Sequence, residues 1–342
     1  MAMLRIRPTS QAATEPVAYN YFLPRDPADL LRQNPKKRTG VEFRSSGCRL
    51  AGHLYRPPAA TETERTPAIV MCGPFSSVKE QTLPHYAERF ANAGYTVLTF
   101  DPRGYGESEG EPRGHYDPTV IIEDYSTAAN YLMRRPDIDA ERTAAVGVCM
   151  GGGFAISVGA RNKKLAAVVG IAGGYNIGGT FQQFMGPEGF AAYLRKINEL
   201  VQHEQVTGTV AYVPTIAMGL SEDIPVAAMP IEEAYSYYDR TSKSDAPTWS
   251  NRTTAHCLEA YFSYNAVVHA PLVAPTPLLI VHGTKDLALL PEYAQAAYDA
   301  AIGPKELVWI DTHNHIELYD HRPYVEMAVE TVVEWLGKAL AR

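Results

Sequence analysis

The chain has 342 residues, of which 46% are hydrophobic and 20% charged, and this composition is typical of a globular protein rather than a disordered or fibrous one. Its formal net charge of −7 supplies no basic field for binding a phosphate backbone, so we expect no nucleic-acid partner. The length permits one large α/β domain with an insertion, or two ordinary domains.

The cysteines and the N-terminal residues indicate the cellular compartment. The four cysteines, at positions 48, 72, 149 and 257, form no C-x-x-C pair and lack the dense spacing of a disulfide-stapled secreted domain. The first residues, MAMLRIRPTSQAATEP, lack the apolar core of a signal peptide, and no apolar run reaches the roughly 18 residues needed to span a membrane. We therefore predict a cytoplasmic protein without a membrane partner.

The first predicted elements are an extension and a hairpin. Residues 1–38 are Pro-rich, with one short apolar cluster at 19–23, and are predicted to form an N-terminal extension rather than a domain. Between residues 41 and 55, apolar and polar residues roughly alternate around Ser45-Ser46-Gly47. This pattern predicts a β-hairpin with one buried face, which opens the core domain.

Short apolar runs then alternate with longer amphipathic stretches. The amphipathic stretches at 84–93 and 119–134 end near a Gly or Pro stop signal and predict helices. Continuously apolar runs are typical of strands buried on both faces of a parallel sheet. We predict such strands at residues 68–71, 95–100, 144–148, 165–171, 278–281 and 307–310. The predicted fold class is therefore α/β, with a doubly wound, mostly parallel sheet.

This regular alternation stops after Gly173-Gly174. About ninety residues follow before the next strand, with helical patterns at 187–204 and 231–238. We predict a mainly helical inserted cap at 175–264, between the two parts of the core at 39–174 and 265–342. Either the cap tyrosines pack the cap onto the core or they line an aromatic substrate pocket. They are Tyr193, Tyr212, Tyr235, Tyr237, Tyr238 and Tyr261.

The most informative segment is 144–153, where an apolar strand meets a Gly-flanked cysteine and then a predicted helix at 154–160. The motif G-x-C-x-G, formed by Gly147, Cys149 and Gly151, is typical of a nucleophile elbow. So sharp a turn leaves no room for Cβ atoms two residues before and after its apex, which explains both glycines. A helix N-terminus also favours a thiolate. We predict Cys149 as the nucleophile, with a buried structural cysteine as the alternative.

The base and the acid are expected after the last strands, in the order nucleophile, acid, histidine. The strand at 278–281 runs into Asp286, and the strand at 307–310 runs into His315, so these two residues are predicted to complete the triad. His313 and His321 are rival bases. Asp311 is a weaker acid candidate, because it lies too close to the histidine loop to orient the ring.

An oxyanion hole needs two backbone N–H groups, one after the nucleophile and one from the loop after the first central strand. Met150 supplies the first. Pro74 has no amide hydrogen, so the second donor is predicted to be Phe75, or Ser76 failing that. Cys72, at the start of this loop, is interpreted as structural.

Three segments resemble a known family: residues 73–81 (GPFSSVKEQ), 100–110 (FDPRGYGESEG) and 315–320 (HIELYD). They are similar to the bacterial dienelactone-hydrolase-like and peptidase-S15-like α/β-hydrolases and to the related fungal polyketide transferases. The resemblance covers residues 40–175 and 265–340. It implies the α/β-hydrolase fold, places the triad and oxyanion roles on the positions derived above, and implies that Asp101, Arg103 and Ser108 brace a loop rather than react.

The chain departs from this family at two places. Many relatives carry serine at the nucleophile, whereas Cys149 resembles the dienelactone-hydrolase branch; one sequence leaves open whether this cysteine is natural or an engineered replacement. Relatives tend to have a Gly-rich tripeptide before the histidine, where this chain has Thr312-His313-Asn314.

The predicted function is hydrolysis of an ester, thioester or lactone-type acyl substrate through an acyl-thioester on Cys149. Transfer of the acyl group to an amine, alcohol or thiol in polyketide-type metabolism is the alternative, because thioesters react readily with such acceptors. A catalytically silent, ligand-binding member is a third possibility. We expect a small-molecule substrate, free or bound to a carrier, and no cofactor or metal; homo-oligomerisation is left open. The cap is expected to fold over Cys149 and enclose an elongated, apolar, tyrosine-lined pocket.

Overall fold

The computed structural model describes residues 28–61 and 64–341. Most of the predicted extension, including the apolar cluster at 19–23, lies outside these residues. Its described end runs along the start of the last helix: the Leu31 N–H donates to the Asp320 carbonyl (2.9 Å), and the Arg322 N–H donates to the Asp29 carbonyl (2.9 Å). A short 3-10 helix, η1 (Pro35–Lys37), then leads into the first strand.

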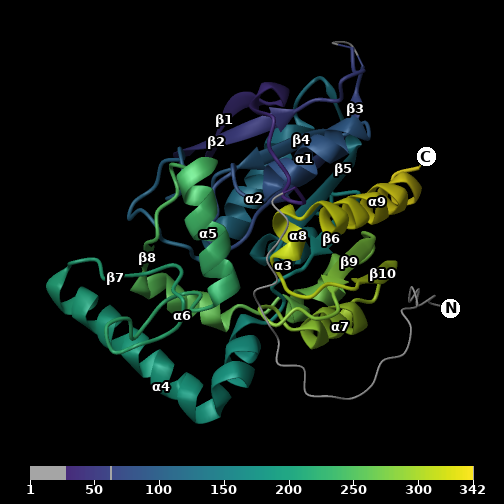
Figure 1. Ribbon diagram of the computed structural model, residues 1–342. Coiled ribbons are helices and arrows are strands. Elements are labelled where there is room, and N and C mark those ends of the chain that lie inside the picture. The colour runs from purple at the N-terminus through teal and green to yellow at the C-terminus, as the bar shows by residue number, and fades with distance from the viewer. Residues whose placement is uncertain (1–27, 62–63, 342) are drawn as a thin grey trace.

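A single eight-stranded sheet forms the centre of the molecule, in the order β1-β2-β4-β3-β5-β6-β9-β10 (Figure 1). β1 and β2 form the predicted hairpin, and β2 is also antiparallel to β4; every other neighbouring pair is parallel. The hairpin turn places Ser46 (φ 44°) and Gly47 (φ 87°) in the left-handed conformation that a tight two-residue turn requires. The strands are β1 (Thr39–Ser45), β2 (Cys48–Tyr55), β3 (Thr66–Cys72), β4 (Thr96–Phe100), β5 (Ile138–Val148), β6 (Ala167–Ile171), β9 (Leu278–Gly283) and β10 (Lys305–Ile310).

Helices cover both faces of this sheet. α1 and α9 contact each other and pack on one face, whereas α2 and α3 pack together on the other. α2 begins at a favourable cap, because the Asp117 side chain accepts a hydrogen bond from the Thr119 N–H (2.7 Å) and Pro118 occupies the first turn. The helices of the core are α1 (Leu83–Asn92), α2 (Pro118–Met133), α3 (Met150–Arg161), α7 (Pro291–Ala300), α8 (Glu317–Asp320) and α9 (Arg322–Ala339).

One long segment separates the adjacent parallel strands β6 and β9. It is mainly helical and contains the long α4, which is kinked at Gly186 (φ 70°) just before Pro187. At the left of Figure 1, α4, α5 and α6 are grouped with the two short strands that pair here. The segment comprises α4 (Ile177–Thr207), β7 (Tyr212–Val213), α5 (Glu232–Ser244), β8 (Thr253–Thr254), α6 (Ala255–Ser263) and η2 (Val267–Val273).

The buried strands explain why the apolar runs of the sequence were informative. β4, β6 and β9 are buried along their whole length, because helices cover the sheet on both sides. The predicted α/β class with a mostly parallel sheet is therefore confirmed. Within the described part of the chain, no helix is long and apolar enough to cross a membrane.

Candidate active site

The candidate residues meet at the carboxyl edge of the parallel strands. β5 ends at Val148, one residue before Cys149, and its neighbour β3 ends at Cys72, three residues before Phe75. On the other side of β5 lie β6, β9 and β10 in turn, and Asp286 and His315 follow the last two of these strands. Parallel strands bring their carboxyl ends to one edge, so residues distant in sequence converge there.

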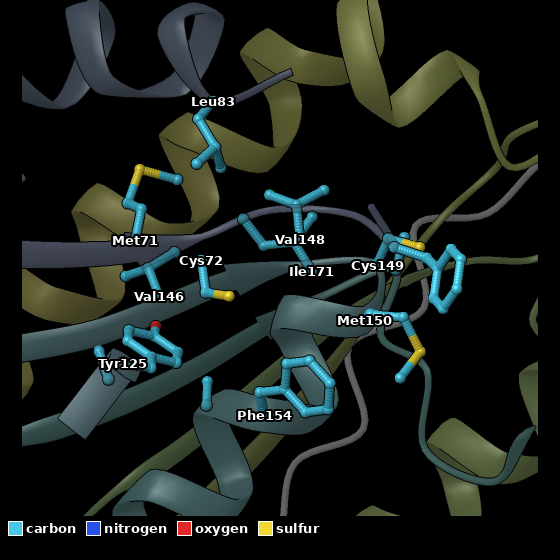
Figure 2. Packing of buried hydrophobic residues seen from close by; sticks show 14 of the residues in the cluster. Met71, Cys72, Leu83, Tyr125, Val146, Val148, Cys149, Met150, Phe154 and Ile171 are labelled. Atoms are coloured by element: carbon cyan, nitrogen blue, oxygen red, sulfur yellow. The ribbon is translucent and has the colours of Figure 1, made fainter. Parts of the chain in front are cut away.

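Cys149 occupies a strained turn between β5 and α3. Its φ of 56° and ψ of −124° are unusual for a residue with a side chain, and such a conformation costs of order 1–3 kcal/mol. The turn is held by its own backbone: the Cys149 N–H donates to the Ile171 carbonyl (3.0 Å), and the Cys149 carbonyl accepts from Gly152 (2.8 Å) and Gly174 (2.9 Å). Figure 2 shows Cys149 at the strand end and Met150 at the start of the helix.

Steric exclusion explains the glycines around the elbow. A Cβ on Gly147 would lie 1.8 Å from the Gly151 carbonyl oxygen, and a Cβ on Gly151 would lie 2.0 Å from the Cys72 carbonyl oxygen. Atoms at such distances overlap, so neither position accepts a side chain without moving the backbone. The reason predicted for these two glycines is confirmed.

Asp286 and His315 form a short hydrogen bond. His315 Nδ1 lies 2.5 Å from Asp286 Oδ2, and the other carboxylate oxygen accepts from the Leu289 N–H (2.8 Å). Asp286 is fully buried and His315 is 3% exposed. The carboxylate therefore fixes the ring with Nδ1 protonated, which turns Nε2 toward the reacting side.

The electrostatics of His315 link it to Cys149. Burial lowers the pKa of the imidazole, but the Asp286 carboxylate and then the Cys149 thiolate raise it by more, so the pKa lies well above its ordinary value of 6.5. Cys149 therefore lies close enough to His315 for their charges to interact. An imidazole of raised pKa next to a thiol accepts its proton and stabilises the resulting ion pair.

The rival residues lie elsewhere. Asp311 is half exposed and pairs with Lys285 (3.1 Å) and Thr284 (3.0 Å). His313 is 56% exposed by its side chain and contacts Glu317 and Tyr324. His321 lies at the start of α9, where the backbone bridges to Leu30. Of the histidines and acids proposed, only His315 and Asp286 form a pair beside Cys149 among the residues described.

Side chains, not glycines, shape the loop before His315. The His313 N–H donates to Glu317 Oε2 (2.7 Å), and Asn314 Oδ1 accepts from the Glu317 N–H (3.0 Å). Thr312 is buried over the end of β9, where its hydroxyl occupies the space that a side chain on Gly283 would fill. These contacts stabilise the turn formed by Thr312-His313-Asn314.

The loop after β3 is fixed next to the elbow. The Gly151 N–H donates to the Gly73 carbonyl (3.0 Å), which joins α3 directly to this loop. The Pro74 carbonyl accepts from the Ser77 N–H (3.2 Å) and the Ser77 hydroxyl (3.0 Å). Met150 begins α3, so its amide precedes the first intrahelical hydrogen bond. Two backbone N–H donors, of Met150 and Phe75, thus lie on segments that flank Cys149.

The site is closed, and the segment between β6 and β9 contributes to the closure. Cys149 is only 6% exposed. Burial and then the charge of Cys149 raise the pKa of the Tyr238, Tyr261 and Tyr319 hydroxyls well above its ordinary value, so all three stay protonated beside the thiol. Tyr238 belongs to α5 and Tyr261 to α6.

The cap tyrosines also pack onto the core. The Tyr238 hydroxyl donates to the Phe75 carbonyl (2.7 Å), Tyr237 bonds Thr82 (2.8 Å), and the Tyr261 ring lies 4.4 Å from that of Phe75. For these three tyrosines the packing alternative is confirmed. Two open cavities, of about 360 and 600 Å³, lie away from Cys149 and are lined by other residues. The elongated tyrosine-lined pocket stays a prediction.

One contact was not anticipated from the sequence. The Tyr319 hydroxyl lies 3.1 Å from His315 Nε2 and close to Cys149. Tyr319 lies four residues after His315, at about one helical turn, and this spacing was a signal that could have identified it.

The residues expected to brace a loop do so. Asp101 is fully buried and accepts from the Lys79 N–H (2.7 Å), the Lys79 ammonium (2.8 Å) and the Glu107 N–H (2.9 Å). The Ser108 hydroxyl donates to the Asp101 carbonyl (2.7 Å). Arg103 pairs with Asp124 of α2. The interpretation of Asp101, Arg103 and Ser108 as structural is confirmed.

Two buried cysteines outside the elbow and the possible metal ligands can also be compared with the requirements of a reactive site. Burial raises the pKa of Cys72 and of Cys257, which keeps both as unreactive thiols and agrees with a structural role for Cys72. Within residues 28–61 and 64–341, no group of three or more His, Cys, Asp or Glu side chains is arranged to hold a metal ion.

Comparison with known proteins adds family information. The family described as "Serine aminopeptidase, S33" matches residues 76–322. Thiohydrolase aneE of Aspergillus aculeatus is 30% identical over 293 residues, covering 84% of this chain and 89% of that protein.

Two solved structures are similar over most of their length. The crystal structure of the α/β hydrolase GrgF from Penicillium superposes with a TM-score of 0.76 at 25% identity, covering 89% of this chain and 99% of that one. GrgF of Penicillium is named a polyketide transferase. A hypothetical protein of Pseudomonas aeruginosa, PA2218, also gives a TM-score of 0.76, at 26% identity, covering 90% of this chain and 96% of that one.

Proposed function

Because this chain belongs to the α/β-hydrolase family described as serine aminopeptidase S33, we propose that it cleaves an ester, thioester or lactone through an acyl-thioester on Cys149. The α/β-hydrolase fold implied by the sequence is confirmed by GrgF and PA2218. Its relatives include a thiohydrolase and a polyketide transferase, so the chain is an enzyme of the hydrolase and acyltransferase type. The nucleophile, the intermediate and the acceptor are the proposed parts.

A single observation carries the proposal. Cys149 lies at the apex of the strained elbow, beside the imidazole of His315, which is itself bonded to Asp286 at 2.5 Å. This arrangement supports the proposed roles of nucleophile, base and orienting acid, because a triad is recognised by geometry rather than by sequence position.

In the first half-reaction, His315 Nε2 accepts the Sγ proton and the thiolate attacks the acyl carbonyl carbon. The carbonyl oxygen becomes an oxyanion, which the Met150 and Phe75 N–H groups stabilise. His315 then returns the proton to the leaving alcohol or thiol as the bond to the leaving group breaks. The products are that alcohol or thiol and a Cys149 thioester.

In the second half-reaction, an acceptor that bears a hydrogen enters the site. His315 Nε2 removes this proton while the acceptor attacks the thioester carbonyl, and the same oxyanion donors act again. Collapse of the intermediate expels the Cys149 thiolate, which is reprotonated by His315. Water as the acceptor gives a carboxylic acid, whereas an alcohol, amine or thiol gives the corresponding acyl product.

The names of the relatives point to the substrate class. A thiohydrolase and a polyketide transferase both suggest an acyl chain held as a thioester, and we infer the same class for this enzyme, either free or attached to a carrier.

Transfer to an acceptor other than water is the second candidate, and burial favours it. Cys149 is 6% exposed and His315 is 3% exposed, so bulk water has little access to an acyl-enzyme. Thioesters also react readily with amines and thiols. The choice between hydrolysis and transfer therefore depends on which acceptor enters under the cap.

Trapping the intermediate tests the proposal. We expect intact-protein mass spectrometry to show one acyl group added to the wild type by a short-chain acyl thioester, located on Cys149 by peptide mapping. Addition of water alone, an amine, an alcohol or a thiol then measures which acceptor removes it. Hydrolysis that no acceptor alters would eliminate the transferase candidate.

Two variants of the nucleophile complete the test. Cys149→Ala should abolish turnover and acylation while the melting temperature stays near that of the wild type, because the elbow accepts a smaller apex. Cys149→Ser should retain weak esterase activity, since a hydroxyl depends more on His315 than a thiol does. Cys48→Ala, at a free cysteine remote from the elbow, is the matched control. Full activity of Cys149→Ala would refute the thiol mechanism. If the wild type binds the acyl thioester but is never acylated, the third possibility, a catalytically silent ligand-binding protein, is favoured instead.

A further inference from the structure

The loop that carries the predicted oxyanion donor is tied to the cap by side chains. Four hydrogen bonds join residues 75–82 to the segment 237–249, and all of their side chains are buried. They are Tyr238 hydroxyl to Phe75 carbonyl (2.7 Å), Trp249 Nε1 to Ser76 Oγ (3.4 Å), Gln81 Nε2 to Thr241 Oγ1 (2.8 Å), and Tyr237 hydroxyl with Thr82 Oγ1 (2.8 Å). These four bonds attach the loop directly to the cap.

Tyr238 is the most constrained of these cap residues. Its ring lies 5.1 Å from Trp249 and edge-on to Tyr237 at 5.3 Å, and it is 1% exposed. Burial raises the pKa of its hydroxyl well above the ordinary value, so the group is always a donor. The packing leaves this hydroxyl aimed at one acceptor, the Phe75 carbonyl.

Peptide planarity makes that acceptor important. The Phe75 carbonyl shares a rigid plane with the Ser76 N–H, and the Pro74 carbonyl shares one with the Phe75 N–H. Ser77 holds the Pro74 carbonyl from inside the loop, and Tyr238 holds the Phe75 carbonyl from the cap. Both planes on either side of the Phe75 Cα are therefore fixed, and with them the direction of the predicted oxyanion donor.

The backbone of Ser76, the next residue, has an unfavourable conformation that external contacts must hold. Ser76 has φ of 58°, a left-handed conformation that a serine does not prefer. Trp249 holds its side chain, and the Phe75 ring is packed between Tyr116 and Tyr261 at 4.4 Å on each side. A loop in an unfavourable conformation relaxes when its external contacts are removed.

We propose that Tyr238 of α5 is a positioning residue for the oxyanion hole, acting through the Phe75 carbonyl, so that the cap forms part of the catalytic apparatus rather than only a cover. The inference rests on the proposed function, because an oxyanion hole matters only if an acyl carbonyl is attacked. It predicts that displacement of α5 lowers the rate of acylation as well as admitting solvent.

The same helix also reaches the histidine side of the site. Arg240 forms an ion pair with Asp320, and the Tyr237 ring lies 4.9 Å from Tyr319, which contacts His315. α5 therefore spans both the oxyanion loop and the segment that follows the base. A displacement of α5 would therefore disturb both sides of the site.

The test separates attack on a carbonyl from simple thiol reactivity. Tyr238→Phe removes the hydroxyl and keeps the ring against Trp249. We expect kcat for a short acyl thioester to fall about tenfold with KM little changed, less than the loss of an oxyanion donor outright. Alkylation of Cys149 by iodoacetamide, a displacement at saturated carbon that forms no oxyanion, should proceed at the wild-type rate.

Tyr193→Phe is the matched control. Tyr193 is another buried cap tyrosine whose hydroxyl donates to a backbone carbonyl, that of Ala227, within the cap itself. It should retain the wild-type kcat, because the Tyr193 hydroxyl both donates to and accepts from the Ala227 backbone and so packs within the cap. Equal kcat in Tyr238→Phe and the wild type would overturn the proposal, as would parallel losses of acylation and alkylation, because these would indicate a general disturbance of the site. Trp249→Phe, which keeps an aromatic ring but removes the bond to Ser76, should repeat the split between the two reactions on a smaller scale.

The same experiments distinguish an error in the proposed function from an error in the role of Tyr238. If Cys149 is not the nucleophile, the wild type itself forms no acyl adduct on this residue, whatever the behaviour of the Tyr238 variant. If the wild type is acylated on Cys149 and Tyr238→Phe reacts equally fast, only the role of Tyr238 is refuted.

Discussion

The elbow and the oxyanion loop lie side by side at the active site but are held by different means. The elbow is fixed by backbone sterics: Gly147 and Gly151, four residues apart, are required because a Cβ on either would strike a carbonyl oxygen. The oxyanion loop is held by local backbone hydrogen bonds and also from the cap, by Tyr238 and Trp249, which lie 163 and 173 residues along the chain from Phe75 and Ser76.

The difference has a functional consequence. The backbone hydrogen bonds that hold the elbow do not involve the cap, whereas part of the set that holds the oxyanion loop comes from cap side chains. Thiol chemistry and acyl chemistry should therefore respond differently to changes in the two regions.

The largest effect is expected where the core supplies the base. His315→Ala should lower kcat by about 10⁴-fold or more, because it removes the group that carries the proton. Asp286→Ala should cost at least about tenfold less than that, since the acid orients and stabilises the imidazole rather than accepting the proton. His313→Ala is the control, because His313 is exposed on the same loop and faces Glu317. Steady-state kinetics with an acyl thioester measures all three, and a large loss at His313 with none at His315 would reverse the assignment.

A smaller effect, on stability, tests the steric account of the elbow. Gly151→Ala places a Cβ 2.0 Å from the Cys72 carbonyl oxygen, and we expect the free energy of unfolding to fall by about 3 kcal/mol. Gly337→Ala is the matched control: nothing lies within 4 Å of its Cβ, and the substitution in α9 should stabilise the protein by up to about 1 kcal/mol. Urea denaturation compares the two variants, and equal stability would show that the elbow backbone adapts easily.

The effect that is smallest at neutral pH concerns the seam between α1 and the cap. Burial, and then Arg89 and Arg240, lower the pKa of His85 to about 3, and its Nδ1 has no hydrogen-bond partner among the described residues. The unfolded chain binds a proton below pH 6.5 whereas the folded chain does not until about pH 3. Stability is therefore fully present above pH 6.5 and is lost as the pH falls toward 3, by up to about 1.4 kcal/mol per pH unit.

Replacing His85 with phenylalanine isolates this contribution. His85→Phe should reduce the slope of unfolding free energy between pH 6 and pH 4 by about that amount. Tyr86→Phe, the neighbouring buried substitution in α1, should change stability without changing the slope, because burial raises the pKa of this phenol and keeps it neutral. Identical slopes in His85→Phe and the wild type would mean that this imidazole does not titrate on unfolding.

The residues of the core were accessible to sequence reasoning for a local reason. Continuous apolar runs mark strands buried on both faces, and a glycine on either side of Cys149 marks a turn that excludes Cβ atoms. Asp286 and His315 follow strands whose carboxyl ends share one edge of a parallel sheet, so the sequence predicts that the two residues converge. Even the structural role of Asp101 could be inferred, from a family resemblance in its loop.

The cap shows where such reasoning ends. Its position between two core strands and its helical content could be predicted, but the sequence left open whether its tyrosines pack or line a pocket. The structure shows that Tyr237, Tyr238 and Tyr261 pack on the core, and it brings Tyr319 to His315. Backbone sterics and strand ends act within a few residues and leave a periodic or spaced pattern in the sequence. A hydroxyl that meets a carbonyl 163 residues away leaves none, because the folded chain alone brings the two together.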